Sequence, residues 1–129
     1  MRIVAILLSA AALVMAGCGA QQPIQNVESS PIILPPGKSV SMQQVTTAIM
    51  RAGTRLGWQM VPEGPGRLSG RIALRNHMAV IDVSHDTKSY SIKYRDSSNL
   101  DARDGMIHRN YNGWIQNLDK GIRSELTLL

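Results

Sequence analysis

The chain has 129 residues, with 14 Lys and Arg against 9 Asp and Glu, and it contains one Cys and three His. This length fits a single domain, and 43% apolar with 18% charged residues is typical of a folded protein. Its size excludes a multidomain enzyme and a polytopic membrane protein, one Cys excludes an intrachain disulfide framework, and no Cys/His cluster has the spacing of a zinc site.

The N-terminal segment has the pattern of an export signal. The chain begins with Met and Arg, and residues 3–16 are apolar apart from Ser9. This run of about 14 residues has the length of a secretory signal and is shorter than the ~20 residues that span a bilayer. Residues 15–18, Met-Ala-Gly-Cys, resemble the lipobox of bacterial lipoproteins, which ends in a small residue and an obligatory Cys.

The lipobox resemblance implies a specific modification. The thiol of Cys18 would receive a diacylglycerol, cleavage would remove residues 1–17, and the new amino group would be acylated. Two or more acyl chains hold a protein stably at a membrane, whereas one holds it only marginally. Because Gly19 rather than Asp follows the Cys, the resemblance further implies sorting to the outer membrane of a Gram-negative cell. The alternative is an ordinary secretory signal with an incidental Cys18.

Residues 18–39 are predicted to be the lipidated Cys and a flexible tether. They are rich in Gln, Ser, Pro and Gly, and no period of 2 or 3.6 persists through them. The exception is the apolar run at residues 31–34, which predicts an edge strand that Pro35 and Pro36 end. A tether of ~20 residues extends to at most ~65 Å, so the domain at residues 40–129 is expected to stand off the membrane.

The domain is predicted to begin with an amphipathic helix. Apolar residues recur every three or four positions from Met42 to Leu56. Ser41 and Gln44 have the spacing of a capping box, and Gly57 is a suitable residue to follow the helix end.

The period then changes to two, which predicts strands. Alternating apolar residues mark runs at residues 58–60, 68–74, 78–84 and 89–95, joined by short turns into an antiparallel meander. The side chains expected to face the core are Ile72, Leu74, Ala79, Ile81, Val83, Tyr90, Ile92 and Tyr94.

A second amphipathic helix is predicted at the C-terminal end. Apolar residues from Ile107 to Leu126 follow one helix face, and Asp104 is the expected N-cap. The element order is therefore (β)αββββα. It predicts an α+β two-layer sandwich, in which two helices cover one face of a four-stranded antiparallel sheet.

No catalytic residue, metal site or cofactor beyond the covalent lipid is predicted. The chain contains no nucleophile-elbow, zincin or phosphate-loop pattern. His77 and His85 lie eight residues apart on one strand, about 26 Å if extended, which is too far to share a metal. His108, beside an apolar stripe, is interpreted as a packing or hydrogen-bonding residue. We therefore expect a protein that is not an enzyme.

The uncovered face of the sheet is the first candidate binding surface. Cations and two apolar residues are predicted to share it: Arg67, Arg71, Arg75, Met78, Val80, Lys93 and Arg95. An apolar centre with cations around it suits an anionic amphiphile or an acidic protein partner. The alternative is a solvated face whose long stems cover the apolar residues. Nucleic acid is not expected, because no outward aromatic pair is present to stack bases.

Polar residues before and within the last helix form a second candidate: Ser98, Asn99, His108, Asn110 and Asn112. They either tie the helix to its loop or line a small polar site at that junction. On the same helix, Gly113, Asn117 and Gly121 recur every four residues as a groove of small side chains. The first helix, through Ala48, Ala52 and Gly53, is its expected occupant, with a partner helix as the alternative.

Three segments carry a further resemblance. Residues 90–94 (YSI-x-Y), 98–100 (SNL) and 107–118 (IH-x-NYN-x-WI-x-NL) are similar to a family of small, largely uncharacterised proteobacterial lipoproteins. The resemblance implies location and fold but no activity. The leading hypothesis is thus an outer-membrane lipoprotein that binds an envelope component or a protein partner. The alternative is an assembly factor that acts through helix contacts within an envelope complex.

Overall fold

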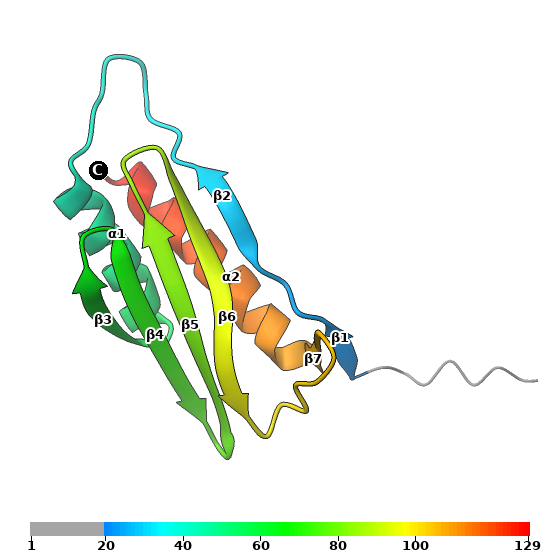
Figure 1. Cartoon of the computed structure of the whole chain (residues 1–129). Helices are drawn as coiled ribbons and strands as arrows, with labels where there is room; N and C mark the ends of the chain where they lie inside the picture. The colour runs from blue at the N-terminus through cyan, green and yellow to red at the C-terminus, as the bar shows by residue number, and fades with distance from the viewer. Residues whose placement is uncertain (1–19) are drawn as a thin grey trace, which may run out of the picture.

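The computed structural model describes residues 20–129, so the predicted signal peptide and Cys18 lie outside the described residues. Within these residues, seven strands and two helices follow in chain order (Figure 1). They are β1 (Gln21–Pro23), β2 (Val27–Pro31), α1 (Met42–Arg55), β3 (Gln59–Gly64), β4 (Arg67–Leu74), β5 (His77–His85), β6 (Ser89–Ser98), β7 (Met106–His108) and α2 (Arg109–Thr127).

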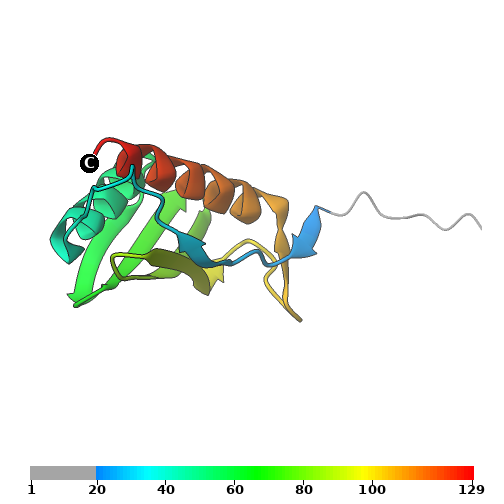
Figure 2. The ribbon, with the colours of Figure 1, turned by 90° about the horizontal axis from the view of Figure 1, so that it is seen from above.

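Five of these strands form one antiparallel sheet in the order β2-β6-β5-β4-β3, and β1 pairs separately with β7. Both helices lie side by side on one face of the sheet, as the view from above shows (Figure 2). The predicted α+β fold with helices on one face is confirmed. The predicted sheet of four strands is corrected to five strands plus a two-stranded pair, because strands also form in the segment before α1.

The prediction of a flexible tether is wrong for residues 21–31. β1 pairs with β7, and β2 pairs with β6 so that Val27 lies opposite Ile92. These strands are short and mostly polar, and backbone hydrogen bonds hold them, so they leave no alternating apolar pattern. The edge strand expected at residues 31–34 lies earlier, and only Ile32 continues the pairing by donating to the carbonyl of Lys88.

Helix α1 follows the predicted pattern. Ser41 and Gln44 form the capping box through two reciprocal hydrogen bonds of 3.1 and 2.9 Å. Gly57 follows the helix at φ +91°, a conformation that costs glycine nothing and strains other residues. Val45 and Ile49 are fully buried against the sheet and α2.

The core lies between the two helices and the helix-facing side of the sheet. The buried strand residues alternate as predicted, except that Leu74 is 45% exposed at the end of β4. A bulge interrupts the pairing of β5 with β6 after Tyr94, so that Ile81 faces Tyr94 while Val80 faces Asp96. Beyond the bulge, Asp96 and Ser98 therefore belong to the face away from the helices.

Helix α2 begins later than expected. His108, not Asp104, is the N-cap, and its ring nitrogen accepts from the backbone of Asn110. Ile107 belongs to β7, where it pairs with Gln22. The predicted start was early because strand pairing with β1 draws residues 106–108 out of the helix. No helix within residues 20–129 is long and apolar enough to cross a membrane.

Candidate functional site

The structure brings most of the predicted sheet-face residues together. We call the outward side of β3, β4, β5 and β6 the open face, since neither helix covers it (Figure 2). Arg67 and Arg71 lie on β4, Met78 and Val80 on β5, and Lys93 and Arg95 on β6. Arg75 does not belong to this face: it lies in the β4–β5 turn at φ +56°.

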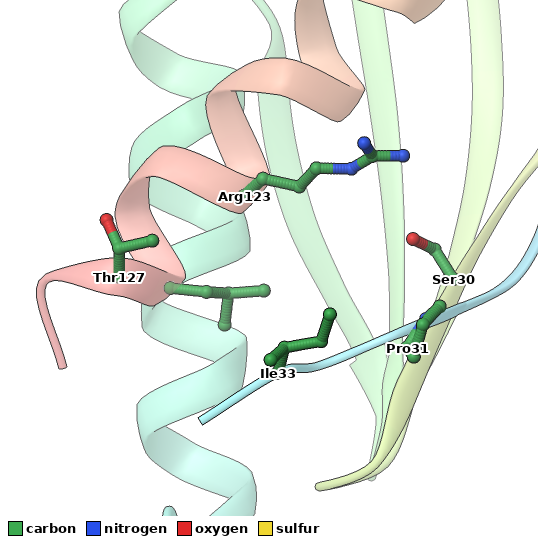
Figure 3. A pocket seen from close by; sticks show the side chains of 6 residues that line it. Ser30, Pro31, Ile33, Arg123 and Thr127 are labelled. Atoms are coloured by element: carbon green, nitrogen blue, oxygen red, sulfur yellow. The ribbon is translucent and has the colours of Figure 1, made fainter. Parts of the chain in front are cut away.

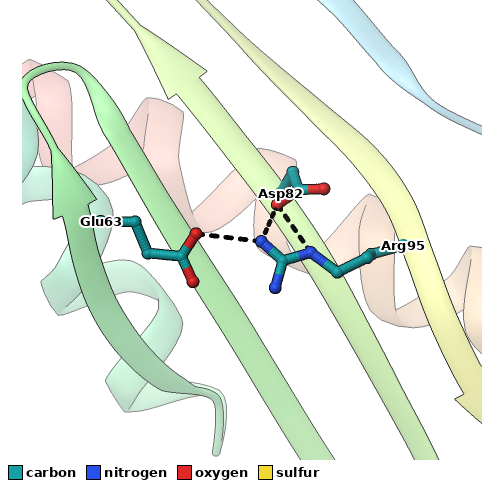
Figure 4. Close-up of polar contacts among 3 residues, drawn as sticks. All are labelled: Glu63, Asp82 and Arg95. Atoms are coloured by element: carbon teal, nitrogen blue, oxygen red, sulfur yellow. Dashed lines mark hydrogen bonds and ion pairs between the residues drawn. The ribbon is translucent and has the colours of Figure 1, made fainter.

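Arg95 is held in an ion cluster in the open face (Figure 4). Its Nε donates to Asp82 at 2.9 Å, its Nη2 donates to the same oxygen, and Nη2 also contacts Glu63 at 3.1 Å. Hydrogen bonds to Asp82 and then Glu63 raise the pKa of Arg95 above its usual value, while hydrogen bonds from Ser69 and then Arg95 lower the pKa of Glu63. Two carboxylates thus surround the Arg95 charge.

Of the other three cations of the open face, Arg67 lies opposite Ser84 of β5, Lys93 lies opposite Asp82, and Arg71 lies opposite an apolar residue. Register places Arg71 beside Val80, with Asp96 on the far side of that valine. Within residues 20–129, no ion pair involves Arg67, Arg71 or Lys93. Glu63, Asp82 and Asp96 accompany the four cations, so the face carries mixed charges rather than a ring of cations.

Sequence reasoning missed three members of the open face. The predicted run ends at Met60, so it omits Val61, which is 53% exposed, and Glu63 was assigned to a turn. Asp96 was missed because the β6 bulge reverses the alternation after Tyr94. The mixed cluster of Pro and Gly after Met60 hid the strand, and only the exposed apolar Val61 signalled that the run continues.

The predicted loop–helix residues do not form one site. Asn99, at φ +57°, donates to the carbonyl of Asn76 at 2.6 Å, and its own carbonyl lies 2.7 Å from His77 Nδ1. His108 stacks on His77 with ring centroids 6.5 Å apart. Ser98 lies on the open face, and Asn110 is exposed at the start of α2. These contacts fix the turns at one end of the sheet, which favours the structural interpretation.

Asn112 has a separate and well-defined place. It is fully buried, its Oδ1 accepts from Gln25 N at 3.0 Å, and its Nδ2 donates to Gln22 Oε1 at 3.1 Å and to the Pro23 carbonyl at 2.9 Å. It therefore joins α2 to the N-terminal segment. Gln116 adds a further hydrogen bond of 3.0 Å to Gln25 on the surface.

A cavity of about 320 Å³ lies between β2 and the C-terminal end of α2 (Figure 3). Its lining residues are Ser30, Pro31, Ile33, Arg123, Leu126 and Thr127. Sequence reasoning missed it because one wall comes from the segment interpreted as a tether. The i,i+4 spacing of Asp119 and Arg123 was the only signal, and their side chains pair at 2.8 Å.

A buried hydroxyl accompanies this ion pair. Tyr90 donates to Asp119 Oδ1 at 2.5 Å, and burial together with that hydrogen bond raises the pKa of Tyr90. Asp119 thus accepts from both Tyr90 and Arg123, so the Arg123 charge beside the cavity is already paired. An anion entering the cavity would gain little from Arg123 alone.

The groove of small residues on α2 is filled in part by α1. A Cβ on Gly121 would lie 3.4 Å from Leu56 and 3.5 Å from Ala52, whereas nothing lies within 4 Å of one on Gly113. The expectation that the first helix occupies the groove is confirmed at Gly121. Gly53 instead lies against Met60 of β3.

Comparisons with known proteins give no further constraint. No family model matches the chain, and neither a curated protein nor a solved structure matches it. Within residues 20–129, no three His, Asp or Glu side chains are grouped so that they could hold a metal ion. Among the described residues, the open face carries apolar side chains together with three cations outside ion pairs, and it is the surface best suited to bind a partner.

Proposed function

We propose that this protein is a lipid-anchored envelope protein that acts by binding, and that its open face contacts an acidic surface of another envelope protein. The observation that carries the proposal is that Arg67, Arg71 and Lys93 share with Met78 and Val80 a sheet face that neither helix covers, and that no ion pair within residues 20–129 involves these cations. The lipobox at residues 15–18 supports the location.

The chemistry of the open face suits a protein partner. Interfaces combine an apolar centre with a polar, charged rim, and arginine is enriched among residues that contribute strongly to binding. Met78 and Val80 are half-buried on β5, and Val61 adds an exposed apolar side chain on β3. The carboxylates of Glu63, Asp82 and Asp96 would repel a uniformly anionic glycolipid, whereas a protein can place cations against them.

Charge reversal tests the proposal. Arg67, Arg71 and Lys93 are changed together to Glu, and neighbours are captured by crosslinking in intact cells and identified by mass spectrometry. The control reverses three exposed cations on other elements: Lys38, Arg51 and Lys120. Both variants change the net charge equally, so only the position of the change differs.

We expect the open-face variant to lose its captured protein neighbours and the control to keep them. The loss should be greatest at low ionic strength, where charge complementarity contributes most. Capture that survives the open-face reversal at low salt would remove this surface as the binding site.

A second candidate function, assembly through helix contacts, is supported by the open position at Gly113. A Cβ on that glycine would meet no atom of another element of the described chain within 4 Å, and Trp114 beside it is only half-buried. Gly113→Leu should then abolish complex formation with the fold intact. Gly121→Leu does not distinguish a lost partner contact from a disturbed fold, because Gly121 packs on α1.

A further inference from the structure

The backbone that follows the lipidation site is fixed from Ala20 onward. The carbonyl of Ala20 accepts from Arg109 N at 2.6 Å, and residues 21–23 pair with residues 106–108. Ile24 N donates to the Gly105 carbonyl at 2.9 Å, and Gln21 Nε2 donates to the Asp101 carbonyl at 2.8 Å. The N-terminal segment is thus held along its length against the start of α2 and the loop before it.

Very little chain separates this fixed backbone from Cys18. Only Gly19 lies between Cys18 and Ala20, and two residues extend over at most about 7 Å. An acyl-modified Cys18 must enter the membrane, so the part of the domain around Ala20 cannot be far from the lipid headgroups. This conclusion rests on the lipid anchor of the proposed function.

We infer that one end of the domain lies directly against the membrane surface. We call it the anchor end and define it by residues 20–21, the β4–β5 turn together with the first residue of β5 (residues 75–77), and residues 99–109. Two contacts join these segments: Asn99 donates a hydrogen bond to the carbonyl of Asn76, and His108 stacks on His77. Figure 1 places the β2–α1 loop at the opposite end of the molecule from β1 and β7.

The charges at the anchor end suit a bilayer with anionic headgroups. Arg75, Arg103 and Arg109 are exposed there, and none belongs to an ion pair within residues 20–129. Asp101 and Asp104 lie in the same loop, so the excess of positive charge is small. The acyl chains therefore supply the affinity, while the arginines favour one orientation of the domain.

This orientation determines how the open face lies relative to the membrane. Strands β4, β5 and β6 run between the anchor end and the opposite end of the sheet (Figure 1). With the anchor end on the membrane, the open face stands at the side of the domain. It is then presented to a neighbour at the same membrane surface rather than to the bilayer itself.

Fluorescence quenching tests the orientation on the lipidated protein in vesicles of phosphatidylethanolamine and phosphatidylglycerol. A fluorophore is attached to Ala102→Cys at the anchor end or to Lys38→Cys in the β2–α1 loop, and a headgroup-labelled lipid serves as quencher. We expect quenching several-fold stronger at position 102. Equal quenching, stronger quenching at position 38, or none at either position in a protein that floats with the vesicles would overturn the orientation while leaving the anchor intact.

The Cys18→Ala chain separates the two proposals. If it floats with the vesicles as well as the parent, or if the mature parent carries an unmodified Cys18, the lipid anchor fails and the orientation fails with it. If flotation requires Cys18, the quenching pattern alone decides the orientation.

An inserted linker tests the cause of the orientation. A flexible Gly/Ser segment of about 20 residues between Gly19 and Ala20 should keep the anchor and the fold but greatly reduce the difference between positions 102 and 38. If the full difference in quenching between the two positions persists, the short connection to Cys18 is not the cause of the orientation.

Charge reversal tests the headgroup contact. Arg103→Glu with Arg109→Glu should weaken quenching at position 102 in these vesicles, whereas Arg51→Glu with Lys120→Glu on the outer faces of the helices should not. An unchanged signal after the first pair would exclude a contact of these arginines with the headgroups.

Discussion

Two buried tyrosines differ in how their hydroxyls are satisfied. Tyr90 donates to Asp119 at 2.5 Å, whereas the hydroxyl of Tyr111 finds no partner within residues 20–129 although the side chain is 0% exposed. The Tyr111 ring packs edge-on against Tyr94 with centroids 5.5 Å apart, and burial raises the pKa of Tyr111. A buried hydroxyl without a partner costs about 1–3 kcal/mol, so the same substitution should act oppositely at the two positions.

We predict that Tyr111→Phe leaves the free energy of unfolding unchanged or raises it by about 1 kcal/mol, since it removes an unsatisfied group and keeps the ring. Tyr90→Phe serves as the matched control and should lower the free energy of unfolding by about 1–2 kcal/mol, because it leaves a carboxylate oxygen of Asp119 without its donor. Urea denaturation of both variants measures the difference. An equal loss in both would mean that the Tyr111 hydroxyl has a hydrogen-bond partner.

At the scale of elements, Asn112 connects α2 to the N-terminal segment. Its amide meets one backbone donor and two acceptors from residues 22–25, all at 2.9 to 3.1 Å. These bonds are shielded from water because Asn112 is fully buried. Removing the amide would remove all three hydrogen bonds and leave a void at a fully buried position, and both effects cost free energy.

We predict that Asn112→Ala lowers the free energy of unfolding by about 2–3 kcal/mol and speeds amide hydrogen exchange in residues 21–31 more than elsewhere. Asn117→Ala, an exposed asparagine on the same helix, should change neither measurement appreciably. Hydrogen exchange followed by mass spectrometry gives the regional readout. Uniform acceleration across the domain would show that Asn112 supports the whole core rather than this connection.

The elements that the sequence predicts well are those with an apolar period. α1, β4 and β5 were expected within one or two residues, because Val45, Ile72 and Ile81 belong to alternating or helical apolar series. β1 and β7 lack such a series: they have three residues each and are stabilised by pairing with each other. A strand that depends on a partner about 85 positions away leaves no local signal.

The candidate site also divides into residues that a local pattern predicts and residues whose positions depend on distant strand pairing. The outward positions of Arg67, Arg71 and Lys93 follow from strand alternation, which the structure retains up to Tyr94. The β6 bulge and the contact of Glu63 with Arg95 depend on pairings between strands, so neither was predictable from one sequence. Their effect is to change a predicted cationic rim into a face of mixed charge.

For the whole molecule, the folded unit extends from residue 20, not residue 40. Ile24, Val27 and Ile32 are partly buried against the core, and β2 covers the outer edge of β6. A chain shortened to residues 39–129 would lose these contacts and expose β6, whose Tyr90 and Ile92 face the core. Unpaired strand edges of this kind promote association between chains.

We predict that the shortened chain is less stable by about 3 kcal/mol or more, since three apolar side chains lose about 1 kcal/mol or more each. Its Tm should fall by about 10 °C or more, and it should self-associate as its concentration rises. Thermal unfolding and sedimentation velocity against residues 20–129 provide the comparison. A shortened chain that stays monomeric with an unchanged Tm would mean that residues 20–38 do not contribute to folding. The anchor end would then be free to move away from the membrane, and the orientation inferred above would lose its basis.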